Sequence, residues 1–544
     1  MRFSNTLLLL ILCFLVITWT VRSVPPQLPV QCDQTGCTVS NTYGVWPDRT
    51  NCKAAKVAYP TTEEELIKAV AYASEHNLKV KTVTKFSSTI AKLACPSGSD
   101  AMLISTSKYN SVIEIEPERL TIKADSGVSL RELIDKVEAA GFSIRMSPYW
   151  EGVSIGGLIS TGSHGSSWSG RGGSVHDHVV GINLVVPATS SEGYAKVVSI
   201  EEGRDDELLN AVKVSLGVLG VISKVKLSIE KAIKRSITNT AVYRYDHRSP
   251  DDVSGNGVND FIGFQSNAIL ISKGVRALEK ALETSKSENG KCKTADATLA
   301  YKKLTGKGLK NNGLFFTGYP VIGTQGKLQS SGSCLYSSSF RIDLSCSWDP
   351  RYNGLSFYET TAIFPVSRFR DFFLDVKKLR DLKPERFCGI DIYNGILIRF
   401  IKGSKAYLGQ TEDSVVIDFN YYRADDALTP RLIQDVMEEM EQMAFVKDGA
   451  KPHWGKNRKV QKYGPNFDKF LEVKNKLDPK MMFSSEWSDE ILFGRESSKY
   501  DGCALEGNCV CSEDRHCSPS KGYFCRQGLV YTQARVCRFS SAQV

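Results

Sequence analysis

The stretch Gly152-Val-Ser-Ile-Gly-Gly-Leu-Ile-Ser-Thr-Gly-Ser-His-Gly165 decides the fold of this 544-residue chain. Glycine is too dense here for an ordinary helix or strand, because each glycine inside such an element lowers its stability. The density predicts that another group approaches the backbone closely. Bare N–H groups and Ser/Thr hydroxyls suit a phosphate or a flat cofactor. The alternative interpretation is a tight turn at the corner of a sheet.

Other signatures exclude several kinds of site. The glycine-rich stretch does not follow the Gly-x-Gly-x-x-Gly pattern of dinucleotide-binding folds. Gly455-Lys456 is followed by Asn457 rather than by the Ser or Thr of a P-loop. His176 and His178 are spaced like two metal ligands, but no third ligand is evident. We therefore expect these histidines to pack beside the site and expect no metal.

Secondary-structure signals on both sides of this stretch predict two kinds of domain. Capped helices at 62–76 and 129–141 alternate with strand-like runs such as 79–84. This alternation is typical of an α/β unit. From about residue 240 onward, strand-like runs such as 414–422 are separated by helical ones such as 369–379. That pattern predicts an α+β region with an antiparallel sheet.

The glycine-rich stretch resembles the flavin-binding signature Gly-Gly-x-Ile-x-Thr-Gly-Ser-His-Gly of the FAD-linked oxidases of the vanillyl-alcohol oxidase type. Further matches to the family occur in the expected order: a strand–helix unit at 118–141, a Gly-x-x-Gly-Val-Ile segment at 217–222, the His-Trp-x-Lys motif of the aldonolactone oxidoreductase branch at 453–456, and the C-terminal signature of that branch at 463–483. Within this branch the chain resembles most the plant L-gulonolactone oxidases.

The resemblance implies an α+β architecture in four parts. A signal peptide at 1–23 precedes a two-subdomain FAD-binding domain at 50–232. A substrate-binding cap with an antiparallel sheet, together with the C-terminal aldonolactone oxidase region, occupies 233–494. A disulfide-rich tail follows at 495–544.

The same resemblance implies FAD as the cofactor, held without a covalent bond. Many relatives carry a histidine in the pyrophosphate loop that bonds covalently to the flavin, and the matching position here is Ser88. The implied FAD contacts come from the pyrophosphate loop, the glycine-rich stretch and the segment near the flavin: Thr84, Lys85, Phe86, Ser87, Ser88, Thr89, Gly156, Gly157, Thr161, Gly162, Ser163, His164, Gly165, Gly217, Gly220, Val221 and Ile222.

Lys456, Arg399 and His453 are the expected catalytic residues. A lysine beside the flavin can stabilise negative charge that develops on the substrate oxygen or on flavin N1. In the alternative interpretation, Lys456 is an ordinary surface lysine and Arg399 is an outward-facing arginine on an edge strand. His453 would then be a packed core histidine. Relatives often carry Glu-x-Arg, whereas Leu397 stands here at the Glu position. This departure points to a different substrate, a lower activity or a base supplied elsewhere.

The N-terminus and the cysteines predict entry into the secretory pathway. Arg2 precedes the apolar run 7–17, and Arg22 ends the run too early for a signal anchor. Of the fifteen cysteines, Cys13 leaves with the signal, and six crowd the last 42 residues. Fourteen cysteines then remain. An even number of cysteines in an oxidising compartment favours disulfides over a zinc site in the tail. We expect an extracellular or vacuolar protein with no membrane span after cleavage.

The formal net charge of +9 is modest for this length and gives no argument for a nucleic-acid partner. We expect an FAD-dependent enzyme that oxidises L-gulono-1,4-lactone, or a related aldonolactone, by hydride transfer to flavin N5 and so gives L-ascorbate. Oxygen or another acceptor would then reoxidise the flavin. The alternatives are a flavin oxidase of other sugars or polyols, and a weakly catalytic flavin-binding protein whose tail binds partners.

Overall fold

The structure is a computed structural model that describes residues 29–40, 52–86, 91–148, 152–168, 170–237, 277–278, 281–282, 284–288, 290–292, 321–328, 357–388, 396–422, 429–456, 466–494, 499–505 and 507–540. The expected signal peptide at 1–23 lies outside these residues, as do Ser87, Ser88 and Thr89 of the expected pyrophosphate loop. Among the helices of the described residues, none is both long and apolar enough to span a bilayer.

The N-terminal domain (52–237) begins with a small parallel sheet. Its strands and neighbouring helices are β4 (Lys56–Ala58), α2 (Glu63–Glu75), β5 (Val80–Val83), α3 (Ala91–Ala94) and β6 (Met102–Ser105), in the strand order β4-β6-β5. Helix α2 starts where the sequence predicts, because the Thr62 hydroxyl accepts the Glu65 N–H at 3.2 Å. Its residues Leu66 and Val70 pack on Val80 of β5.

A larger antiparallel sheet forms the main core of the N-terminal domain, in the order β11-β10-β12-β8-β7 with β9 beside β12. These strands are β7 (Ile113–Glu116), β8 (Thr121–Asp125), β9 (Phe142–Ile144), β10 (Val179–Pro187), β11 (Ala195–Glu201) and β12 (Val221–Lys231). Helices α4 (Leu130–Ala139), α5 (Ile155–Ser160) and α6 (Asp206–Val212) cover the sheet. Leu133, Ile159 and Leu209 of these helices share one buried core with Leu184 of β10.

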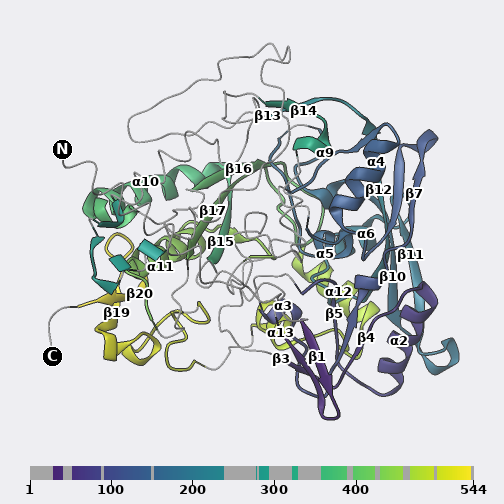
Figure 1. Ribbon diagram of the computed structural model, residues 1–544, viewed down its shortest axis with the longest axis horizontal. Helices are drawn as coiled ribbons and strands as arrows, with labels where there is room; N and C mark the ends of the chain where they lie inside the picture. Colours follow the sequence, from purple (N-terminus) through teal and green to yellow (C-terminus); the bar gives the residue numbers. More distant parts are fainter. Residues whose placement is uncertain are drawn as a thin grey trace, which may run out of the picture.

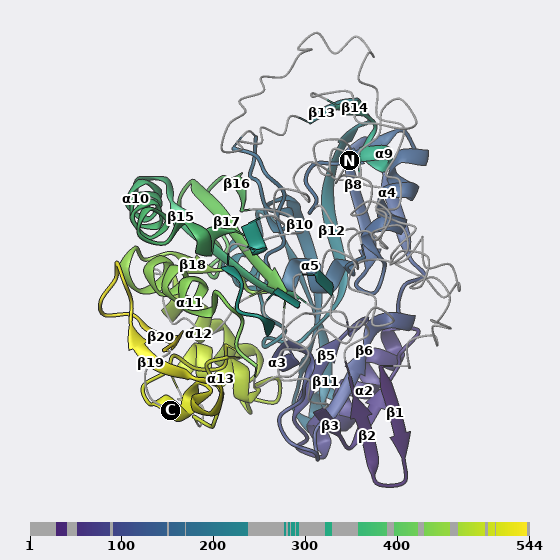
Figure 2. The ribbon, with the colours of Figure 1, turned by 60° about the vertical axis from the view of Figure 1, so that its left-hand side comes forward.

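The second domain (357–456) is built on another antiparallel sheet, which confirms the expected α+β architecture. Its order is β16 (Leu397–Ile401), β17 (Ser414–Tyr422), β15 (Phe357–Pro365) and β18 (Lys451–Pro452). One face packs under helices α10 (Val366–Leu382) and α11 (Gln434–Gln442), where Phe364 and Ile417 are buried. Side chains alternate between faces, so Ile363, Val416 and Ile401 lie on the other face. This other face turns toward the N-terminal domain (Figure 2).

Helices α12 (Phe467–Leu477) and α13 (Glu486–Phe493) return to the N-terminal domain (Figure 1). Phe470 and Trp487 belong to the core that holds the large N-terminal sheet. Lys474 is fully buried, and its Nζ donates to the Val218 carbonyl at 2.9 Å and to Asp478 at 3.0 Å. The last part of the sequence region 233–494 therefore packs with the N-terminal domain rather than with the sheet of the second domain.

The cysteines of the described residues form six disulfides. Three tie the tail, whose hairpin consists of β19 (Tyr523–Gln527) and β20 (Arg535–Phe539): Cys503–Cys509, Cys511–Cys525 and Cys517–Cys537. The others are Cys32–Cys37, Cys52–Cys95 and Cys292–Cys388. The shorter strands and helix that remain are β1 (Val30–Asp33), β2 (Gly36–Val39), β3 (Cys52–Ala54), β13 (Arg235–Ile237), β14 (Val321–Gly323) and α9 (Gln325–Leu328).

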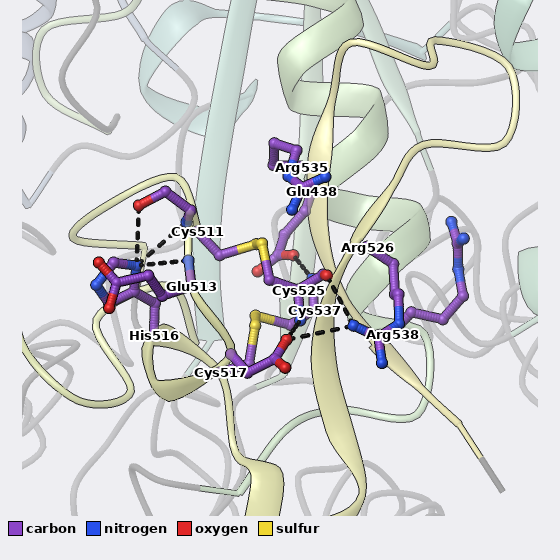
Figure 3. The surroundings of a disulfide bond; sticks show 12 residues. Glu438, Cys511, Glu513, His516, Cys517, Cys525, Arg526, Arg535, Cys537 and Arg538 are labelled. Atoms are coloured by element: carbon purple, nitrogen blue, oxygen red, sulfur yellow. Dashed lines mark hydrogen bonds and ion pairs between the residues drawn. A yellow bond between two sulfur atoms is a disulfide. The ribbon is translucent and has the colours of Figure 1, made fainter. Parts of the chain in front are cut away.

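Two buried carboxylates of α11 attach the tail to the second domain, and Figure 3 shows one of them, Glu438, beside Cys537. Glu439 accepts the three consecutive backbone N–H groups of 529–531, at 2.6 to 2.9 Å. Glu438 accepts the Cys537 N–H at 2.6 Å. Charge-assisted hydrogen bonds of this kind are about twice as strong as neutral ones, so the tail is an integral layer of the second domain.

Candidate active site

The glycine-rich stretch folds into α5 and the turn after it, and its glycines stand where the backbone is approached closely. A Cβ at Gly156 would lie 2.9 Å from the Cβ of Ser126, and one at Gly165 would lie 2.9 Å from the Ser147 carbonyl oxygen. Gly162 follows the helix with φ of 68°, a left-handed conformation that side chains disfavour. The groups that lie against these glycines are other segments of the chain itself. That a cofactor approaches this backbone stays a prediction.

The turn fixes His164 with a free acceptor nitrogen. The Nδ1 atom lies 2.9 Å from the Gly165 carbonyl oxygen. A carbonyl oxygen can only accept, so Nδ1 carries the proton of the neutral ring and Nε2 is an acceptor. This Nε2 is buried and has no hydrogen-bond partner among the described residues.

His453 shows the opposite arrangement. Its Nδ1 accepts the N–H of Gly455 at 3.1 Å, so the proton of the neutral ring is on Nε2, which is a donor. The rings of His453 and His164 lie 5.1 Å apart between centroids. The two neutral imidazoles therefore offer one donor and one acceptor side by side.

These histidines line a cavity of about 20 Å³, enough for one water molecule. The cavity lies between the two domains. The N-terminal domain contributes Thr161, Gly162, His164, Ser174, His176 and Val214, and the second domain contributes Ile363, Ile401, Leu408, Gly409, Gln410, Pro452, His453 and Trp454. Glycine-rich backbone forms one wall and the inner face of the second sheet forms the other.

A polar cluster extends this wall along the inner face of the sheet. The carboxylate of Asp418 on β17 is its centre, with 2% of the residue exposed. Arg399 Nη2 on β16 lies 2.7 Å from Asp418 Oδ2, and Lys456 Nζ lies 3.7 Å from Oδ1. The Thr361 hydroxyl on β15 also donates to Oδ1. Three strands and the segment after β18 thus meet at one carboxylate.

The charges of this cluster set the protonation of the site. Burial by itself would raise the pKa of Asp418, but the positive charges of Lys456 and Arg399 and the Thr361 hydrogen bond hold that pKa well below its usual range. Burial, then the charges of Lys456 and Arg399, lowers the pKa of His453 to about 3. Burial also lowers the pKa of His164. With both imidazoles neutral, one anion and two cations leave a net charge of +1.

The lowered pKa of His453 predicts an acid-sensitive stability. An unfolded histidine titrates near 6.5, so between about pH 6.5 and 3 the unfolded state binds a proton that the folded state excludes. The free energy of unfolding should therefore fall as the pH drops below 6.5, by up to about 1.4 kcal/mol per pH unit from this group. Urea unfolding at pH 7, 6 and 5 should show a shallower fall in His453→Gln. Equal pH dependence in the two proteins would contradict this expectation.

His176 and Asp177 connect the domains next to the cavity. The Ser404 hydroxyl donates to Asp177 Oδ1 at 2.5 Å and lies 3.1 Å from His176 Nε2. His178 Nε2 lies 3.2 Å from the Gly172 carbonyl. These contacts are those of packed, hydrogen-bonded side chains. In the tail, two groups of cysteines, one of them with His516, are close enough to hold an ion, but their cysteines form disulfides.

The structure brings the three expected catalytic residues together. Arg399 and Lys456 share Asp418, and His453 lies at the cavity within the field of both cations. Of the expected cofactor residues, Thr161, Gly162 and His164 line the cavity. Gly156, Gly157, Ser163 and Gly165 lie in α5 and its turn.

Other expected cofactor residues lie away from the cavity. Gly217 and Gly220 lie between α6 and β12, just after Leu216, whose N–H donates to the Ser160 carbonyl at the end of α5. Val221 and Ile222 are buried in two hydrophobic cores. At the end of β5, Thr84 and Lys85 precede Phe86, which packs in the small core near Leu103. The Thr84 hydroxyl is 2.8 Å from that of Thr106.

Asp418 is the functional residue that sequence reasoning missed. The run 414–422 predicts a strand, and Asp418 is the carboxylate that follows the apolar residues 415–417. A lone acid among buried apolar residues needs a cationic or hydrogen-bonding partner. That signal was present in the sequence, but it does not say which cations the strand would meet.

The N-terminal domain fits FAD in its unpaired polar atoms. Thr82 Oγ1 on β5 and Ser126 Oγ after β8 are buried without a hydrogen-bond partner among the described residues. Buried polar groups are normally satisfied, and a ligand rich in phosphate, hydroxyl and ring heteroatoms would satisfy these. The close packing of Gly156 on Ser126 and of Gly165 on Ser147 holds the glycine-rich segment beside these atoms.

Family models match three parts of the chain. The FAD binding domain model matches residues 54–190, and the D-arabinono-1,4-lactone oxidase model matches residues 355–491. The model of the C-terminal domain of L-gulonolactone oxidase 2-like proteins matches residues 500–539. The matches follow the order of the N-terminal domain, the second domain with α12 and α13, and the tail.

Whole-chain relatives carry the same assignment. The chain is 79% identical to L-gulonolactone oxidase 3 of Arabidopsis thaliana over 100% of both chains, and 41% identical to L-gulonolactone oxidase 5 of that plant over 96% of both. A solved structure of a solvent-stable cholesterol oxidase has the same fold, with a TM-score of 0.60 at 13% identity, over 86% of this chain and 100% of that one. The chain therefore belongs to the L-gulonolactone oxidase family of FAD-dependent oxidoreductases.

Proposed function

We propose that this protein oxidises L-gulono-1,4-lactone at C2 and that the resulting keto lactone enolises to L-ascorbate. The observation that carries the proposal is the cluster of Arg399, Asp418 and Lys456 next to His453. His453 in turn lines a small cavity together with the glycine-rich turn. A lactone is neutral, and removal of its hydroxyl proton creates negative charge. A site of net charge +1 with neutral histidines suits that change.

When bound, FAD would supply the hydride acceptor for this oxidation. The residues of the chain bind and orient the lactone. His453 donates a hydrogen bond from Nε2 to a substrate oxygen, and His164 Nε2 offers the complementary acceptor to the substrate hydroxyl. Lys456 and Arg399 stabilise the negative charge that develops on oxygen. The apolar side chains of Ile363 and Ile401 exclude water from this wall.

A substrate panel separates this proposal from oxidation of other sugars or polyols. The flavin-loaded protein is supplied with L-gulono-1,4-lactone, other aldonolactones, hexoses and sugar alcohols, with oxygen or an electron-accepting dye as oxidant. We expect turnover with L-gulono-1,4-lactone above the other classes and L-ascorbate as the product. Preference for a sugar alcohol, or a product other than ascorbate, would refute the proposed substrate. The oxygen and dye arms identify the electron acceptor.

Non-covalent attachment of FAD is a separate part of the proposal. It rests on Ser88, which stands where relatives carry the flavin-linked histidine. Acid precipitation of the yellow holoprotein should leave the flavin in the supernatant, and absorbance at the flavin bands measures its distribution. Yellow colour retained in the washed pellet would contradict this prediction.

We also propose that the mature protein enters the secretory pathway and resides in an extracellular or vacuolar compartment. Six disulfides among the described residues support an oxidising compartment. A full-length fluorescent fusion retained in the cytosol would overturn this assignment.

A further inference from the structure

Relatives often carry a glutamate two residues before the arginine, where this chain has Leu397. The strand pairing of the second sheet brings a different carboxylate next to that position. Leu397 on β16 and Asp418 on β17 are direct partners across the antiparallel pair. The Cβ atoms of such partners lie about 4.5–5.5 Å apart on one face of the sheet. Arg399, two residues after Leu397, points to the same face. Asp418 is therefore the cross-strand neighbour of the position that relatives fill with glutamate.

Among the described residues, the Asp418 carboxylate contacts other residues of the site. Its Oδ2 binds Arg399 at 2.7 Å, and its Oδ1 accepts from Thr361 and lies 3.7 Å from Lys456. Both oxygens face cations or donors, which hold the pKa of Asp418 well below its usual range and make it a weak base toward a substrate hydroxyl. A buried carboxylate in this arrangement fixes the direction of its cations.

We propose that Asp418 is the positioning residue of the active site: by binding Arg399 and Lys456 it holds both cations at the substrate face, and it replaces, from the neighbouring strand, the carboxylate absent at Leu397. This inference rests on the proposed function for its substrate but not for its geometry. It also explains how the chain keeps an ordered pair of cations without Glu-x-Arg.

A transposition experiment tests the proposal. Asp418→Asn removes the charge and keeps the size. Leu397→Glu in the Asp418→Asn background returns a carboxylate on the opposite strand, and Leu397→Gln in the same background is its uncharged match. Asp381→Asn, at an exposed carboxylate paired with Arg380, serves as the surface control. All variants are loaded with FAD, and only those with wild-type flavin content are compared.

The first readout is flavin reduction by L-gulono-1,4-lactone without oxygen. Asp418→Asn should lower the limiting rate constant about 100-fold, because misplaced cations stabilise the transition state less. Affinity for a 2-deoxy lactone, which cannot be oxidised at C2, should change less than threefold. Relative to Asp418→Asn alone, the added Leu397→Glu change should raise this rate constant at least tenfold. The added Leu397→Gln change should leave it unaltered. A rate within threefold of wild type in Asp418→Asn, or equal rates in the Glu and Gln double variants, would overturn the proposal.

The second readout needs no substrate turnover. Sulfite adds to N5 of flavins and leaves negative charge on the ring, so its dissociation constant reports how well positive charge is placed nearby. Positioning by Asp418 predicts weaker sulfite binding in Asp418→Asn, by at least threefold, with recovery in the Leu397→Glu double variant. Tighter binding would show that Asp418 only neutralises charge and would refute the proposal. If no lactone reduces the wild-type flavin while the sulfite pattern holds, the proposed substrate fails and the role of Asp418 stands.

Discussion

Replacing Lys456 by methionine is expected to slow the reduction of the bound flavin by L-gulono-1,4-lactone about 100- to 1000-fold, the usual loss when one preorganised charge-stabilising group is removed. The ammonium group lies 3.7 Å from Asp418 Oδ1. Its positive charge helps to lower the pKa of His453. Methionine keeps the length and apolar stem of the side chain. The loss should therefore appear in the rate constant of reduction rather than in the lactone dissociation constant.

Stopped-flow absorbance under anaerobic conditions measures both constants. Lys377→Met is the matched control, because Lys377 lies on the exposed side of α10 and pairs with Asp381 at 3.6 Å. This control should react like the wild type. A Lys456→Met protein with normal flavin content that is reduced within threefold of the wild-type rate would show that Lys456 is the surface lysine of the alternative interpretation.

Replacing Glu439 by alanine is expected to lower the free energy of unfolding by about 3–5 kcal/mol, because the change leaves several buried groups unpaired at once. The carboxylate is completely buried and accepts three N–H groups of 529–531. Arg538 Nη2 lies 3.8 Å from its Oε2 and would lose a counter-charge. Alanine supplies no acceptor to any of them.

Urea unfolding followed by tryptophan fluorescence measures this loss, with the disulfides intact. Glu64→Ala is the matched control, since Glu64 is an exposed helix carboxylate in an ion pair with Lys68, and such pairs contribute about 0.3–0.5 kcal/mol. Glu439→Gln should be intermediate, because its amide oxygen still accepts hydrogen bonds. A Glu439→Ala protein as stable as the Glu64→Ala control would mean that the tail does not stabilise the second domain.

Local sequence signals are sufficient for several elements, whereas FAD follows from the family resemblance and is supported by the match to the FAD binding domain model. The cap at Thr62 fixes the start of α2, and the run 414–422 is β17 along its whole length. The glycines at 156 and 165 stand where Ser126 and Ser147 pack against the backbone. These features depend on neighbouring residues along the chain, and neighbouring residues are what a single sequence displays.

The site itself depends on contacts between distant segments. Asp418 meets Arg399 only because β16 and β17 pair in one particular register, and a shift by one residue would turn it to the opposite face. Lys456 joins them because β18 returns beside β15. The hydrogen bonds from the tail to Glu439 likewise join residues about 90 positions apart. Composition and periodicity contain no information about such pairings.

The most direct test of the central claim is a single anaerobic mixing of the FAD-loaded wild-type protein with excess L-gulono-1,4-lactone. The account predicts that the flavin absorbance bleaches fully and that one L-ascorbate forms per flavin reduced. A flavin that remains oxidised in the presence of the lactone, in protein shown to contain bound FAD, would contradict it.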